Sequence, residues 1–143
     1  LDAFRGKDHA GNTHLMRTGD FEFGQVGQGF EHEGLVDRRW TGYLHFFQLW
    51  INLPRANKMD PPTIINCASS KLPSVEIHDS PRAIVKVLLG ENVFGATSPV
   101  ESPHVPAQYL DFELAAGAEV NYEPPLEMET RLAYVYRGEP SVG

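Results

Sequence analysis

The sequence predicts an all-β protein, and three observations support this fold class. Short runs of β-forming residues recur along the chain, and 13 glycines and 11 prolines separate them. Several runs alternate apolar and polar residues, which is typical of a half-buried strand. No segment carries apolar residues at helical spacing over ten or more positions. Many short strands at regular spacing favour a sandwich or a barrel.

The strands are predicted in chain order from these patterns. Residues 21–23 alternate, residues 44–53 are rich in aromatics and end at a proline, and residues 83–89 lie between Pro81 and Gly90. Residues 109–114 alternate and are followed by a glycine turn, and residues 131–136 are stopped by Arg137 and Gly138. The proline-containing stretches 58–62 and 98–106 are predicted to be connections.

The length and net charge of the chain disfavour several classes of function. A chain of 143 residues fits one domain, and its net charge of −7 disfavours direct contact with nucleic acid or an anionic membrane. The longest apolar run, residues 44–53, is much shorter than the ~20 residues of a membrane helix. The single cysteine, Cys67, excludes an intrachain disulfide and suits a reducing compartment, so we expect a cytoplasmic protein.

Four stretches occur in a specific order. Residues 18–32 hold a Gly-Asp turn, a strand and the spacing Gly-x-Gly-x-x-His, which ends at His32. Residues 47–54 read Phe-Gln-Leu-Trp-Ile-Asn-Leu-Pro. Residues 87–100 and 109–118 supply the third and fourth stretches. In this order and spacing they resemble the pirin family of the cupin superfamily, over residues 1–139.

The resemblance implies a cupin-type, jelly-roll-like β-barrel. Pirins hold two barrels in a chain of about twice this length, and this sequence resembles the middle of one. Residues 1–54 would be the closing half of a first barrel, 55–106 a linker region with strands, and 107–143 the opening half of a second. We expect the three parts to form one compact unit. Open half-barrels leave unpaired strand edges. We therefore expect either one hybrid barrel per chain or half-barrels completed by a swapped dimer.

The resemblance also implies an iron site built from histidines and a carboxylate. His32 stands where the family has a histidine ligand, but Gly34 holds the position of the glutamate. Glu33 is one residue early, and a shift of one residue turns a strand side chain to the other face. The candidate metal ligands are therefore His32 and Glu33, with Glu33 dependent on a bulge or turn.

The other family ligands are missing from the sequence. Alignment of residues 130–138 on the family framework places Pro124 and Leu126 where histidines would stand, and neither binds metal. No cofactor is expected from this set, although iron stays possible through His32. Within the aromatic run, His45, Gln48 and Trp50 are candidates to line a barrel cavity, with core packing as the simpler interpretation. The histidines at positions 9, 14, 78 and 104 are expected on the surface or in loops.

These observations leave two classes of function. The preferred hypothesis is a non-catalytic binding or self-association module, with a homodimer, a protein partner or a small apolar ligand. The alternative is an iron-dependent oxygenase resembling quercetin 2,3-dioxygenase, or a metal-linked transcription cofactor. Enzyme activity is the less favoured hypothesis, because a metal held by so few ligands would bind poorly.

Overall fold

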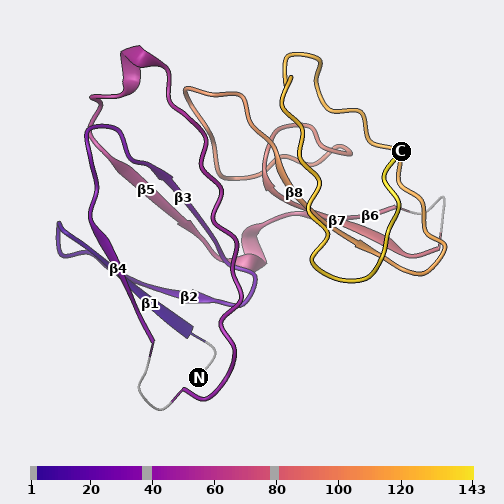
Figure 1. The fold of residues 1–143 in the computed structure, drawn as a ribbon, viewed down its shortest axis with the longest axis horizontal. Helices are drawn as coiled ribbons and strands as arrows, with labels where there is room; N and C mark the ends of the chain where they lie inside the picture. The colour runs from indigo at the N-terminus through magenta and orange to yellow at the C-terminus, as the bar shows by residue number, and fades with distance from the viewer. Residues whose placement is uncertain (1–2, 37–39, 78–80) are drawn as a thin grey trace.

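The regular secondary structure of the chain is almost entirely β-strand, which confirms the predicted fold class. The computed structural model describes residues 3–36, 40–77 and 81–143, and Figure 1 shows their ribbon. The strands are β1 (Ala3–Asp8), β2 (Thr13–Arg17), β3 (Phe21–Gln25), β4 (His32–Leu35), β5 (Thr63–Cys67), β6 (Ser74–Ile77), β7 (Ala83–Leu89) and β8 (Tyr109–Leu114). Two single-turn 3₁₀ helices, η1 (Arg55–Asn57) and η2 (Ser69–Lys71), complete the described elements. In the described part of the chain, no helix has the length and hydropathy to cross a membrane.

The strands form three antiparallel sheets. The first has the order β2-β1-β4, the second pairs β3 with β5, and the third has the order β6-β7-β8. The first two lie together on one side of the molecule, and the third lies beside them (Figure 1). The sheets do not close into a barrel, so the open form agrees with half-barrels rather than with one hybrid barrel. The swapped dimer and the divisions at residues 54 and 106 stay predictions.

The buried core lies at the junction of the second and third sheets. Strand β7 buries every second residue, and Ala83, Val85 and Val87 are fully covered. At the C-terminal end of β7, Leu89 forms one apolar cluster with Cys67, Leu72 and Val100. Aromatic residues from β3 and β8 pack against this cluster: Phe21, Phe23 and Tyr109. The alternating burial of β7 is the expected result of a strand with one face on the core.

Asp20 joins the turn between β2 and β3 to the segment before β6. Its Oδ2 accepts the backbone N–H of Arg17 at 2.8 Å, and its Oδ1 accepts the backbone N–H of Ser69 at 2.7 Å. Gly19 reaches φ +81 at this turn, a conformation that favours glycine. The Nζ of Lys86 donates to the carbonyl of Gly19 at 3.1 Å. These bonds connect the N-terminal sheets to β7.

Two of the predicted strands are wrong. Residues 44–53 and 131–136 run as irregular segments, and the residues between 131 and 136 are exposed. A strand needs a neighbour to receive its backbone hydrogen bonds, and neither segment has one among the described residues. The predicted strands at residues 21–23, 83–89 and 109–114 are confirmed as β3, β7 and β8.

Candidate functional site

A pocket of about 270 Å³ opens between the first sheet and the second. Its apolar wall comes from Phe30, Pro62 and Ile64. Its polar lining includes carboxylates, imidazoles and amides: Asp8, His9, Asn12, His14, Glu22, His32 and Asn66. This mixture of apolar walls and a few polar groups is typical of a small-molecule site.

The strand register places His14 and His32 on the same face of the first sheet. His14 lies opposite Gly6, Gly6 lies opposite Gly34, and His32 lies opposite Asp8. Residues that lie directly opposite each other share one face of a sheet, and residues two apart on one strand do the same. Both histidines therefore belong to the face that borders the pocket.

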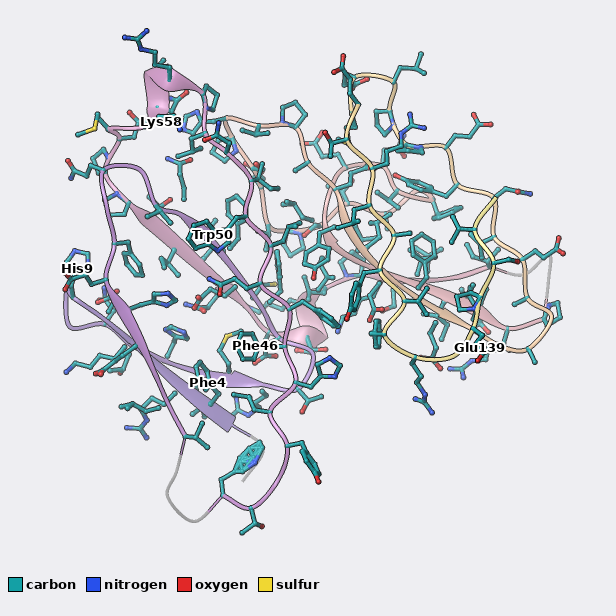
Figure 2. All side chains as sticks on the ribbon, in the orientation of Figure 1. Phe4, His9, Phe46, Trp50, Lys58 and Glu139 are labelled. Carbon is teal, nitrogen blue, oxygen red and sulfur yellow. The ribbon has the colours of Figure 1, made fainter. Side chains whose placement is uncertain are left out.

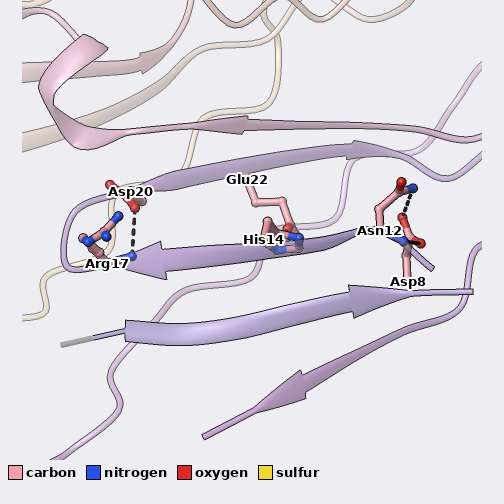
Figure 3. A network of polar contacts seen from close by, with 6 residues as sticks. All are labelled: Asp8, Asn12, His14, Arg17, Asp20 and Glu22. Carbon is pink, nitrogen blue, oxygen red and sulfur yellow. Dashed lines mark hydrogen bonds and ion pairs between the residues drawn. The ribbon is translucent and has the colours of Figure 1, made fainter. Parts of the chain in front are cut away.

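His14 and Glu22 form the closest charged contact of the pocket. The Nε2 of His14 lies 2.7 Å from Oε2 of Glu22, and Figure 3 shows the two side chains meeting between β2 and β3. Only 21% of the His14 side chain and 25% of the Glu22 side chain are exposed. A pair of this kind is an ion pair whenever the imidazole is protonated.

Along the pocket wall, Asp8 and Asn12 hold the turn between β1 and β2. Asp8 accepts the backbone N–H of Asn12 at 2.8 Å and its side-chain amide at 2.7 Å (Figure 3). The hydrogen bond from the Asn12 side chain lowers the pKa of Asp8 below its ordinary value. Asp8 therefore stays ionised in mildly acidic solution and holds the turn in place.

Two glycines make room for rings on this face of the sheet. A Cβ on Gly6 would lie 2.2 Å from Cε1 and Nε2 of His14, so the imidazole lies directly over β1. A Cβ on Gly34 would lie 2.0 Å from Cζ of Phe4. Real Cβ atoms do not approach other atoms so closely, because packed atoms keep van der Waals separations. The ring of Phe4 therefore fills the space above position 34.

The two predicted metal ligands point to opposite faces. His32 lies on the pocket face, 5.6 Å from Phe30 between ring centroids. Glu33 lies opposite Lys7 on the other face, with Oε1 at 4.0 Å from Nζ of Lys7. Across residues 3–36, 40–77 and 81–143, no group of three or more His, Cys, Asp or Glu side chains is placed to hold a metal ion. A shared metal at His32 and Glu33 stays a prediction.

The predicted cavity residues lie elsewhere. His45, Gln48 and Trp50 belong to the irregular segment before η1 and do not line the pocket. Trp50 is 87% exposed. The ring of His45 lies 4.9 Å from that of Phe47, centroid to centroid. Leu126, at one of the two positions where the family resemblance would place histidines, is 91% exposed.

Sequence reasoning missed His14 and Glu22, which it assigned to the surface or to an ordinary strand. One signal was available, because the two residues stand four positions before and after Thr18, at the Gly-Asp turn. Two strands that leave one turn can bring such equidistant residues together. The signal is weak here because β2 and β3 belong to different sheets.

Comparison with known proteins adds the family context. No protein-family model matches the chain. The chain is 31% identical over 143 residues to a Vibrio cholerae protein named "putative quercetin 2,3-dioxygenase", covering 98% of this chain and 49% of that protein. It is 31% identical over 138 residues to a pirin-like protein of Caulobacter vibrioides, covering 96% and 49%.

A solved structure shares the fold. The quercetin 2,3-dioxygenase of Acinetobacter baumannii superposes with a TM-score of 0.66 at 24% identity, over 80% of this chain and 40% of that chain. The chain therefore spans about half the length of the curated relatives it matches.

Proposed function

The chain is related by sequence to the pirin-like proteins of the cupin superfamily, and from this premise we propose that it is a non-catalytic binding module. Its site is the pocket between the sheets β2-β1-β4 and β3-β5. The observation that carries the proposal is the half-buried pair of His14 and Glu22 inside a pocket with apolar walls. Polar groups of this kind fix the orientation of a ligand whose apolar part fills the remaining space.

The pocket chemistry favours a small planar molecule with hydroxyl groups. Glu22 can accept a hydrogen bond from a ligand hydroxyl, and the amide of Asn66 can donate one or accept one. Phe30 and Ile64 offer apolar surface to a ring. The volume of about 270 Å³ is near the lower limit for drug-sized ligands, which favours a compact molecule of no more than about three rings.

The iron that the fold family implies does not fit the residues that the structure describes. A facial iron site needs three protein ligands and open positions. On the pocket face, position 34 is glycine beneath the ring of Phe4, and Glu33 points to the other side. His32 alone keeps both the residue type and the face that the family resemblance requires.

An iron-dependent oxygenase is the second candidate, and the name of the Vibrio cholerae relative favours it. In this alternative, His32 would be one ligand, and the remaining ligands would come from outside the described residues. The two candidates differ in one measurable property, because only the oxygenase needs metal.

Binding of quercetin to metal-free protein tests the proposal. The chain is purified with a chelator and titrated with quercetin by calorimetry. We expect saturable binding to one site with a Kd on the order of 10–100 µM, from about 0.3 kcal/mol per non-hydrogen atom. Glu22→Gln removes the charged acceptor, so we expect affinity to fall by about tenfold.

Glu76→Gln is the matched control, because Glu76 lies on the exposed side of β6 in the third sheet. We expect this variant to bind quercetin as the unchanged chain does. Absence of saturable binding, or equal affinity of the Glu22→Gln and Glu76→Gln variants, would refute the proposed site. Binding that appears only after ferrous iron is added would favour the oxygenase.

A further inference from the structure

Two irregular segments far apart in the sequence expose a continuous set of apolar side chains. We define the aromatic face as residues 43–51 together with residues 132–136. The segments meet through their rings, because the Phe47 centroid lies 5.5 Å from that of Tyr134 and 5.4 Å from that of Tyr136. Figure 2 labels Phe46 and Trp50 on the first segment, which passes between the N-terminal sheets and the third sheet.

The side chains of the aromatic face are unusually exposed. Tyr43 is 99% exposed, Trp50 87% and Phe46 66%. On the second segment, Leu132 is 80% exposed and Tyr134 70%. A contiguous apolar surface of this kind marks an interaction site in a soluble protein.

The backbone of the first segment is open as well. Among the described residues, no backbone group of residues 40–53 forms a hydrogen bond with another backbone group. Large apolar residues occur at both odd and even positions, so both faces of the segment are apolar. A segment with apolar residues on both faces and open edges has the character of a central strand that lacks its neighbours.

The surface of the chain indicates how much of it is left uncovered. The accessible surface is 11096 Å². A folded monomer of 16.0 kDa has an accessible surface of about 7,400 Å². The excess is about half of the expected surface, and it exceeds the 1,000–2,500 Å² or so that each partner buries in a stable homodimer. The chain therefore exposes enough excess surface to form a dimer interface at the aromatic face.

We propose that a second copy of this chain covers the aromatic face, through antiparallel pairing of residues 43–51 with the same residues of the copy. A two-fold axis at Phe47 places Tyr43 opposite Ile51 and Leu44 opposite Trp50. Each opposed pair then contains at least one apolar residue, and such cross-strand pairs stabilise a sheet. The same segment serves both chains, as an isologous dimer requires.

Charge favours a second copy at this place. The whole chain carries a net charge of −7, so two copies repel each other over most of their surfaces. Residues 40–54 contain no Asp, Glu, Lys or Arg. Pairing through this segment therefore brings no like charges together, and it supplies backbone partners to the open edges. The inference does not depend on ligand binding in the pocket.

The mass of the protein in solution tests the inference. Light scattering and sedimentation equilibrium are measured from about 0.5 to 50 µM, a range that spans a Kd of about 1 µM and a tenfold increase in it. We expect the unchanged chain to approach twice the mass of 16.0 kDa at the highest concentration. Trp50→Glu places a charge in the pairing segment and Gln48→Pro removes a backbone N–H from it, so we expect both to raise the dimer Kd at least about tenfold.

Leu126→Glu is the matched control, because Leu126 is 91% exposed but lies outside the aromatic face. We expect this variant to remain dimeric. Since Trp50 is 87% exposed, its substitution leaves the folded monomer intact, and cooperative urea unfolding verifies this. A single-chain mass at every concentration would overturn the inference. A dimer that neither Trp50→Glu nor Gln48→Pro weakens would overturn it as well.

Discussion

The ring of Phe4 lies over Gly34, so that a Cβ atom on Gly34 would stand 2.0 Å from Cζ of Phe4 and 2.5 Å from its Cε2. Phe4 belongs to β1 and Gly34 to β4, two neighbouring strands of the first sheet. Position 34 is where the pirin resemblance expects a carboxylate ligand. In this structure the position holds a glycine beneath an apolar ring.

This packing predicts a steric penalty for any side chain at position 34. We expect Gly34→Ala to lower the free energy of unfolding by about 1–3 kcal/mol, because the new methyl group collides with the ring of Phe4. Urea unfolding measures the change. In the background of Phe4→Ala the collision disappears, so the same substitution should then have a smaller effect.

Gly24→Ala provides the control for the Gly34 substitution. A Cβ on Gly24 would meet only Cδ1 of Ile64, at an ordinary 3.6 Å. We expect its effect on the free energy of unfolding to stay within about 1 kcal/mol. Equal losses for Gly24→Ala and Gly34→Ala would show that the ring does not fill the space above position 34.

The hydrogen bonds that Asp20 accepts lead to a second prediction about the free energy of unfolding. Asp20→Ala removes both acceptors of the backbone N–H groups of Arg17 and Ser69. We expect a loss of about 1–3 kcal/mol, since the amide of Ser69 is partly buried and would lack its partner. Asp8→Ala, which removes exposed hydrogen bonds within a single turn, should lose less. The reverse order in thermal unfolding would contradict the role of Asp20 in joining the sheets.

Tyr136 predicts a change at alkaline pH. The hydroxyl of Tyr136 donates to Oδ1 of Asp111 at 2.7 Å, and this bond raises the pKa of Tyr136 to about 12. The unfolded value is about 10. A pKa raised by folding contributes stability that is fully present below about pH 10 and is lost as the pH rises through about 12.

Absorbance of the phenolate form measures this titration. Tyr136→Phe removes one tyrosine from the alkaline titration curve. We expect the step that disappears to be one near pH 12. Asp111→Asn removes the charge of the acceptor and should move this step toward lower pH. If the step that disappears in Tyr136→Phe lies near pH 10 instead, the hydrogen bond to Asp111 does not persist in solution.

The sequence correctly predicts strands that pair with a neighbouring strand in the structure. It wrongly predicts strands in segments that have no neighbouring strand among the described residues. Residues 83–89 are β-forming, bury every second side chain and pair with strands on both edges, so local pattern and tertiary structure agree. Residues 44–53 have an equally strong β pattern but no neighbouring strand among the described residues. Strand propensity reflects packing against neighbours more than an intrinsic backbone preference. The missing neighbours therefore explain the error.

The candidate site was predictable only in part. The family resemblance located His32 and the glycine at position 34, and the strand register places Glu33 on the opposite face from His32. The contact of His14 with Glu22 depends on how two separate sheets approach each other. That distance depends on the packing of side chains such as Ile64 and Phe30 around the pocket, and spacing along the chain does not encode it.

The central claim is that the described residues form a binding pocket without an iron site. The iron content of the purified chain tests this claim most directly. The chain is purified without a histidine tag, loaded with ferrous iron, desalted and measured by elemental mass spectrometry. We predict far less than one iron per chain, with the same content in His32→Ala, because no group of three metal ligands is found among residues 3–36, 40–77 and 81–143. One iron per chain that is lost in His32→Ala would contradict the account.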